Sequence, residues 1–172
     1  MGGTIALRYA LGHPGDLSRL AAGDSLAGVP EELASVRDQR LEFIETHSLR
    51  EIAQARMAVA FTASADPATK AWVIKMIAGG DLEGYRSQAR ATMTFDIRHR
   101  LGETATPATI IHGELDATAP AAFATMMGQA IPGATVHIIK GQGHLPHLEA
   151  PQLFNPLLAG ALAVAEDVVP AY

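Results

Sequence analysis

Two short polar segments contain the residues best suited to chemistry. The segment HGELDATAP (112–120) holds Asp116, and KGQGHLPHLEAP (140–151) holds His144, 28 residues further along the chain. A carboxylate placed against one ring nitrogen of a His fixes the tautomer of the ring and stabilises its imidazolium form. Such a pair can serve a nucleophile as general base and afterwards as general acid. Asp116 and His144 are therefore a candidate acid–base pair.

Each of these segments follows a predicted strand. Residues 106–113 and 134–141 are runs of β-branched and apolar residues ended by Gly, a pattern typical of buried strands. A helix is predicted between them at 121–131, and buried strands that alternate with helices indicate a parallel sheet. Ligands bind beyond the carboxyl ends of parallel strands. We therefore expect Asp116 and His144 to meet at one edge of the sheet.

The remaining core elements are predicted near the two ends of the chain. Residues 4–11 predict a helix that ends at Gly12, and a weak apolar run at 19–28 is consistent with a short strand. A closing helix is predicted over 152–168, interrupted by Pro156. The apolar face expected for the first helix consists of Ile5, Ala6, Tyr9 and Ala10.

Residues 29–95 carry signals for helices only, and four are predicted there. The first begins near Pro30, with acidic residues in its first turn. The second carries a capping box formed by Ser48 and Glu51. The third has Asp66 as its N-cap, and the fourth ends before residue 96. This all-helical segment interrupts the alternation of strands and helices.

The composition excludes several classes of function. The chain has 172 residues, 48% of them hydrophobic and 18% charged, which is typical of a globular domain with a buried core. Its net charge of -5 argues against nucleic-acid and anionic membrane partners. The absence of Cys excludes disulfides, thiol catalysis and thiolate metal sites. Without a visible signal peptide or an apolar run long enough to span a bilayer, we expect a cytoplasmic protein.

The polar segments and the opening of the chain resemble one known family. HGELDATAP followed by IPGATVHIIKGQGHLPHLEAPQLF resembles the C-terminal signature of the α/β-hydrolase fold family, whose acid and His follow the last two strands. MGGTIALRYALGHP resembles the end of that family's nucleophile elbow, G-x-S-x-G, and the helix after it. In this alignment the nucleophilic Ser would precede Met1. The backbone N–H of Met1 would help form the oxyanion hole, and Gly2 would be the last Gly of the elbow.

The resemblance implies a fold and a division of the chain. It implies the C-terminal part of an α/β-hydrolase fold, with parallel strands flanked by helices and a helical cap insertion. Residues 1–28 and 96–172 would form the core, without its N-terminal strands, and 29–95 would form the cap. The intact form would hydrolyse a small carboxylic ester or lactone without a cofactor, as esterases and enol-lactonases do. His144 would be the base and then the acid, and Asp116 would orient it.

The nucleophile is the point at which the chain departs from this pattern. None of its own Ser residues falls at a predicted strand-to-helix elbow: Ser18, Ser25, Ser35, Ser48, Ser64 and Ser87. The residue before Met1 could also be Asp, as in dehalogenases and epoxide hydrolases. One alternative is therefore an inactive chain, or a subunit that needs a separate N-terminal partner. An incomplete sheet would then expose an edge and favour self-association. Another alternative is a binding module that uses the cap as a pocket.

Individual residues also have other possible roles. Asp116 could cap the helix after Pro120, and Asp24 is the second candidate for the acid. His112 could be a packing or supporting residue, and His147 could line a pocket. A metal held by His144, His147 and Asp116 is the remaining alternative. The residues of the helical segment that could line a pocket or fill its core are Met57, Trp72, Met76 and Tyr85.

Overall fold

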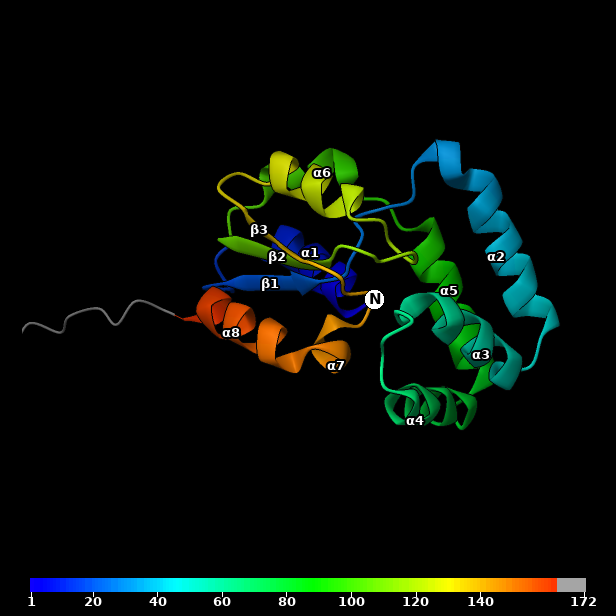
Figure 1. The fold of residues 1–172 in the computed structure, drawn as a ribbon. Coiled ribbons are helices and arrows are strands. Elements are labelled where there is room, and N and C mark those ends of the chain that lie inside the picture. Colours follow the sequence, from blue (N-terminus) through cyan, green and yellow to red (C-terminus); the bar gives the residue numbers. More distant parts are fainter. Residues whose placement is uncertain (164–172) are drawn as a thin grey trace, which may run out of the picture.

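Three parallel strands form the sheet in the part of the chain that the structure describes (Figure 1). The structure, a computed structural model, describes residues 1–163, so the part of the predicted closing helix at 164–168 lies outside the described residues. The strands, in sheet order, are β1 (Leu20–Gly23), β2 (Ala108–Gly113) and β3 (Thr135–Ile139). Leu20 pairs with Ala108, and Thr109 pairs with Thr135. The α/β class and the parallel strands expected from the sequence are confirmed.

Helices cover both faces of the sheet (Figure 1). On one face, α1 (Gly2–Gly12) and α6 (Ala122–Ala130) enclose a core whose fully buried members include Leu7, Ile110 and Met127. On the other face, Phe154 of α8 (Pro151–Leu162) packs with Ile111 and Ile139. Consecutive strand residues point to opposite faces, which is why Ile110 and Ile111 belong to different cores. The central strand β2 therefore ties the two layers together.

The face that the first helix turns inward matches the predicted one only in part: Ala10 is buried and Ala6 packs against the core. Its buried residues are Thr4, Leu7, Ala10 and Leu11. Ile5 and Tyr9, predicted to be buried, are 58% and 43% exposed. The Thr4 hydroxyl donates a hydrogen bond to the carbonyl oxygen of Leu26, 3.0 Å away, and this bond holds the Thr4 face against the core. A polar residue thus fixes the rotation of a helix whose apolar residues allow two faces.

The outer strands differ from the predicted ones. The weak run at 19–28 forms a strand of only 4 residues, because Asp24 adopts a left-handed conformation (φ 43°) directly after it. β3 forms where expected, but it is not the buried strand that the sequence suggested. Ile139 is buried, whereas Thr135 and Ile138 are exposed. Within residues 1–163 no further strand pairs beyond β3, so this strand is an edge.

The predicted helical segment forms a layer beside the sheet (Figure 1). Its helices are α2 (Ala34–Thr46), α3 (Leu49–Ala60), α4 (Pro67–Ala78) and α5 (Leu82–Thr94), flanked by the 3-10 helices η1 (Glu31–Leu33) and η2 (Arg98–Glu103). The Ser48–Glu51 capping box is present, and Asp66 accepts hydrogen bonds from two backbone N–H groups of α4. These local signals are confirmed as helix starts. A four-residue helix, α7 (Pro146–Glu149), precedes α8.

Of the four residues predicted to line a pocket or fill the core of this layer, two are exposed to solvent instead. Met57 is buried between α3 and α4, in a cluster with Phe61 and Val73. Trp72 and Met76, also on α4, are 55% and 56% exposed. The reason is that α4 packs against α3 with its Val73 side and leaves its other face open to solvent.

The described helices also bear on membrane insertion. Across residues 1–163, none of them is both long enough and apolar enough to cross a membrane.

Candidate active site

The loops after the three strands bring three ionisable side chains together. Asp24 follows β1, Asp116 follows β2, and His144 follows β3. One ligand atom from each of these residues lies within 4.8 Å of the others. The predicted meeting of the two polar segments at the carboxyl edge of the sheet therefore occurs, with Asp24 as a third member.

Asp116 and His144 are joined by a short hydrogen bond. Asp116 Oδ2 lies 2.7 Å from His144 Nδ1, and Asp116 is 4% exposed. Burial alone would raise the pKa of Asp116, but hydrogen bonds from His112 and His144 hold that pKa below its ordinary value. An ionised carboxylate only accepts hydrogen bonds, so Nδ1 carries the proton and Nε2 keeps its lone pair. The ring is therefore in the tautomer that a general base requires.

His112 holds the Asp116 loop from inside. The ring is fully buried, and its Nε2 lies 2.6 Å from the carbonyl oxygen of Ala119 and 3.3 Å from Asp116 Oδ2. Because a carbonyl oxygen only accepts, Nε2 carries a proton that both oxygens share. Burial lowers the pKa of His112, but these two bonds outweigh it and the pKa is raised. Of the alternatives left open for this residue, the structure shows the supporting contact.

Asp116 also arranges its own loop. Its Oδ1 accepts hydrogen bonds from the backbone N–H groups of Thr118 and Ala119, at 2.7 and 2.8 Å. α6 begins only at Ala122 and has no side-chain cap. Asp116 is therefore not the N-cap of that helix, which was its structural alternative. Its Oδ1 is thus held by the loop backbone, while its Oδ2 faces the two His rings.

Asp24 sits beside this pair in a different environment. Its Oδ1 accepts a hydrogen bond of 2.8 Å from the backbone N–H of Gly113, which joins the ends of β1 and β2. Burial raises the pKa of Asp24 to about 7, and the single backbone bond does not offset it. In the described part of the chain, His144 is hydrogen-bonded to Asp116 and not to Asp24.

The His144 loop is tied to the helical layer. The backbone N–H of His144 donates to the carbonyl oxygen of Ala60, the last residue of α3, at 2.8 Å. The Glu149 carboxylate accepts from the backbone N–H of Gly143 at 3.1 Å and from that of Thr62 at 3.0 Å. Sequence reasoning did not single out this role of Glu149, because its partner Thr62 is 87 residues away.

The metal alternative is not formed as predicted. The three residues whose donor atoms gather within metal-binding reach are Asp24, Asp116 and His144, and His147 is not among them within residues 1–163. The His147 ring packs on Phe154, with 5.7 Å between ring centroids. Burial, and then the nearby His144, lower the pKa of His147. Its contacts are those of a packing residue under α8.

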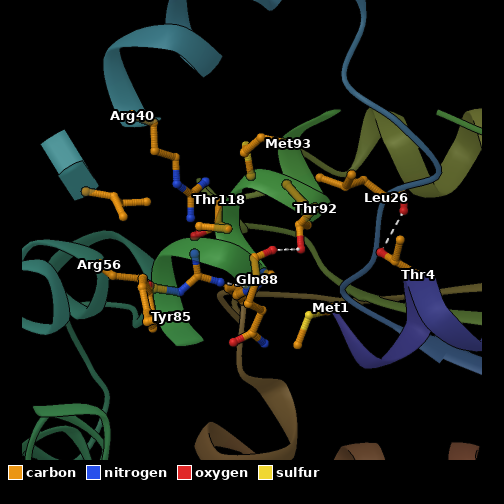
Figure 2. Close-up of a pocket in the computed structure, with 14 residues that line it drawn as sticks. Met1, Thr4, Leu26, Arg40, Arg56, Tyr85, Gln88, Thr92, Met93 and Thr118 are labelled. Carbon is orange, nitrogen blue, oxygen red and sulfur yellow. Dashed lines mark hydrogen bonds between the residues drawn. The ribbon is translucent and has the colours of Figure 1, made fainter. Parts of the chain in front are cut away.

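A cavity of about 230 Å³ opens beside His144 (Figure 2). The core contributes Met1, Thr4, Leu26, Thr118, Ala119 and His144 to its wall. The helical layer contributes Arg40, Ile44, Arg56, Tyr85, Gln88, Ala89, Thr92 and Met93. The predicted elbow residue Met1 and the predicted base His144 thus line one cavity. Of the four residues considered above for the helical layer, Tyr85 reaches it.

The start of α1 places its two glycines differently. A methyl group at Gly2 would meet nothing within 4 Å, whereas one at Gly3 would overlap the Ser25 hydroxyl oxygen. Gly3 is therefore the glycine that lets α1 approach β1 and the residues after it. The assignment of Gly2 to the elbow rests on the resemblance alone.

No Ser of the described residues is placed as a nucleophile. Ser25 lies two residues after the end of β1, but it is 2% exposed and its hydroxyl donates to the carbonyl oxygen of Gly23 at 2.7 Å. None of the Ser residues lines the cavity beside His144. The acid–base pair is therefore present next to a cavity to which residues 1–163 bring no Ser.

The chain resembles known proteins both in sequence and in structure. The model described as "Alpha/beta hydrolase family" matches residues 1–157. A Karrikin insensitive 2 receptor IA from Petunia hybrida is 37% identical over 70 residues, which are 40% of this chain and 26% of that protein. The enol-lactonase from Burkholderia xenovorans superposes with a TM-score of 0.86 at 25% identity, over 94% of this chain and 62% of that one.

Two further solved structures share the fold. A hydrolase from Pseudomonas aeruginosa has a TM-score of 0.84 at 22% identity, over 94% of this chain and 62% of that one. An esterase from Exiguobacterium antarcticum also has a TM-score of 0.84, at 20% identity, over 93% of this chain and 63% of that one. The chain thus spans less than two thirds of the length of these structures. With residues 1–157 matched by the family model, the chain belongs to the alpha/beta hydrolase family.

Proposed function

We propose that this chain supplies the acid–base pair and the cap of a hydrolase that cleaves a small carboxylic ester or lactone. The observation that carries the proposal is the 2.7 Å bond between Asp116 and His144, which leaves Nε2 of His144 unprotonated beside the cavity, with Arg56 Nη2 3.4 Å away. Family membership supports hydrolase chemistry, and the likeness to an enol-lactonase at 25% identity favours this substrate class.

In this proposal the nucleophile is a Ser contributed by sequence that precedes Met1. Its oxygen attacks the acyl carbon while its proton passes to Nε2 of His144, and Asp116 stabilises the imidazolium. His144 then returns the proton to the departing alkoxide oxygen as the acyl–oxygen bond breaks. Water attacks the acyl-enzyme in the same way, and the acid leaves as the Ser proton is restored. The backbone N–H of Met1 stabilises the oxyanion.

The helices between residues 29 and 95 act as the cap in this mechanism. α2, α3 and α5 supply eight of the residues that line the cavity, opposite the strand-end loops. They keep bulk water away from the acyl group and shape the space around it. The core then consists of residues 1–28 and 96–172, the division that the sequence suggests, of which 164–172 lie outside the described residues.

The test is to express the chain with the sequence that precedes Met1 in its own reading frame. We expect labelling by a fluorophosphonate probe and turnover of a small ester. His144→Ala abolishes turnover, and Asp116→Asn lowers kcat by about 10⁴-fold because the imidazole takes the wrong tautomer. His13→Ala, an exposed residue at the end of α1, is the control and keeps full activity. Full activity in His144→Ala would overturn the site.

A second candidate is a chain without catalysis of its own, either inactive or dependent on a separate N-terminal subunit. The observation that favours it is that no Ser among residues 1–163 lines the cavity. It predicts that the extended protein is not labelled by the probe. Labelling that appears only after a separate N-terminal polypeptide is added would identify the two-subunit form.

A further inference from the structure

The cavity beside His144 is lined by two arginines and by no carboxylate. Arg40 comes from α2 and Arg56 from α3, and both guanidinium groups point into the space between the helices (Figure 2). None of the 14 lining residues is Asp or Glu. Among the described residues, neither arginine forms an ion pair, although five other arginines do: Arg37, Arg86, Arg90, Arg98 and Arg100.

This concentration of positive charge does not follow from the charge of the chain as a whole. The net charge is -5, and acidic residues outnumber basic ones by 18 to 13. Both arginines are half-buried, so each guanidinium has lost part of its hydration without gaining a carboxylate partner. An unpaired cation in such a place is costly, and an anion that enters the cavity offsets that cost.

One neutral polar group in the same wall also lacks a hydrogen-bond partner in the described part of the chain. The Thr118 hydroxyl oxygen is buried and has no hydrogen-bond partner among residues 1–163, and Thr118 lines the cavity. Buried polar atoms in native proteins nearly always have a partner. An oxygen-bearing ligand between Thr118 and the arginines would supply one.

The two arginines lie at different positions relative to Nε2 of His144, the proposed base. Arg56 Nη2 lies 3.4 Å from His144 Nε2, so its charge is at the catalytic end. Arg40 is not hydrogen-bonded to His144. It also lines an adjoining cavity of about 220 Å³, together with apolar side chains such as Phe43, Ile52 and Val59. A substrate can therefore extend from His144 along both arginines.

We propose that the acyl substrate of this protein carries a carboxylate group, which Arg40 and Arg56 bind inside the cap. The guanidinium fork matches the planar geometry of a carboxylate, and pairs of this kind form two parallel hydrogen bonds. This inference rests on the proposed hydrolase function and deepens it. It predicts that half-esters of dicarboxylic acids, or lactones with a free acid, bind better than neutral esters.

The experiment compares two ligands that share one ester bond. Monomethyl glutarate is an anion at neutral pH, and dimethyl glutarate is neutral. Their dissociation constants are measured by NMR titration of the isotope-labelled chain, which needs no turnover. We expect the anion to bind about tenfold more tightly, with shifts at residues 40 and 56, and to lose that advantage as salt rises.

Matched variants assign the preference to the cavity. Arg40→Gln removes the preference for the anion, and Arg40→Lys retains part of it. Arg40→Gln is the decisive variant, since Arg56 also contacts His144. Arg37→Gln on α2 and Arg50→Gln on α3 are the controls, because these residues lie on the same helices but outside the cavity. Both controls keep the full preference.

Three results would overturn the inference. They are equal binding of the two esters, an unchanged preference in Arg40→Gln, and inorganic phosphate that binds as tightly as the half-ester. A failure of the proposed function has a different signature. The extended protein would then turn over neither ester, while the binding preference of the chain remained. If the extended protein turned over both esters with equal KM values, the inference about carboxylate binding would be contradicted, but the proposed hydrolase function would not.

Discussion

Asp24 and Asp116 lie in the same cluster, yet the protein pushes their pKa values in opposite directions. Both are buried, and burial alone raises the pKa of each. Asp116 has hydrogen bonds from two His rings and two backbone N–H groups, which favour its ionised form. Asp24 has one backbone donor, Gly113. Separated values of this kind assign different roles to neighbouring carboxyl groups. Asp116 is the partner of His144, and Asp24 is a carboxyl group that is half protonated near neutral pH.

Asp24→Asn tests this assignment through stability. The pKa of Asp24 is about 7 in the folded protein, against an ordinary value of 3.8. Because the folded-state pKa is raised, its contribution to the free energy of unfolding is full below about pH 4 and is lost as the pH rises through 7. Asn keeps an acceptor for Gly113 N–H but does not ionise. Relative to the wild type, the free energy of unfolding of the variant should therefore rise as the pH increases from about 4 to about 7, by up to about 4 kcal/mol.

Urea unfolding near pH 5 and near pH 8 measures most of this difference, about 3 kcal/mol, because about 2 pH units separate pH 5 from the pKa of the folded state. Taking the difference between variant and wild type cancels most of the opposite contribution of Asp116, whose lowered pKa adds stability that is lost in acid. The exposed Asp16→Asn is the control and should show the same difference at both pH values. A pH-independent difference for Asp24→Asn would show that Asp24 is ionised throughout.

At the scale of elements, the features that could be predicted from the sequence are those set by residues close together in the chain. Caps such as Ser48 and Asp66 mark helix starts within four residues, so they can be read without a fold. The meeting of Asp116 and His144 followed from two strand ends in one parallel sheet. The contacts that sequence reasoning missed join segments far apart, such as the bond from Gly113 to Asp24, 89 residues away. The predicted burial of β3 was wrong for the same reason. Whether a strand lies at the edge of a sheet depends on strands that are distant in the sequence.

The approach of α1 to β1 gives a prediction with a built-in control. A methyl group at Gly3 would overlap Ser25 Oγ and lie 3.3 Å from the side chain of Ala22. Gly3→Ala should therefore force α1 away from β1 and lower the free energy of unfolding by about 1–3 kcal/mol. Gly2→Ala meets no atom within 4 Å and should be neutral or stabilising by up to about 1 kcal/mol. Thermal unfolding of the two variants compares them, and equal losses would contradict this packing.

The carboxylate of Glu149 gives a second prediction at this scale. It accepts backbone hydrogen bonds from Gly143 in the His144 loop and from Thr62 after α3. Glu149→Ala leaves both N–H groups without this acceptor and should cost about 3 kcal/mol. Glu149→Gln keeps one acceptor oxygen and should lose less. Hydrogen exchange is the measurement: faster exchange at residues 143 and 62, with α6 unchanged, is expected. Uniform acceleration along the chain would point to global destabilisation instead.

At the scale of the whole molecule, the edges of the sheet matter most. Within residues 1–163, β1 and β3 each pair with β2 only. The backbone N–H groups of Leu20 and Asp24 donate toward β2. Because donors alternate along a strand, the N–H groups of Ala21 and Gly23 point to the other edge. Ile5 and Tyr9 of α1, which packs on β1, are exposed large side chains. An unpaired strand edge is a template for a second strand.

We therefore predict that the chain associates with itself through the β1 edge. Light scattering coupled to gel filtration, over roughly a hundredfold range of concentration, should show a mass that rises toward a dimer or larger species. Ala21→Pro removes an outward donor without removing a β1–β2 bond, so it should shift the mass toward the monomer. Val36→Glu changes an exposed apolar residue on α2 and should leave the association unchanged. A monomer at every concentration would contradict this prediction and would mean that the β1 edge is protected against pairing.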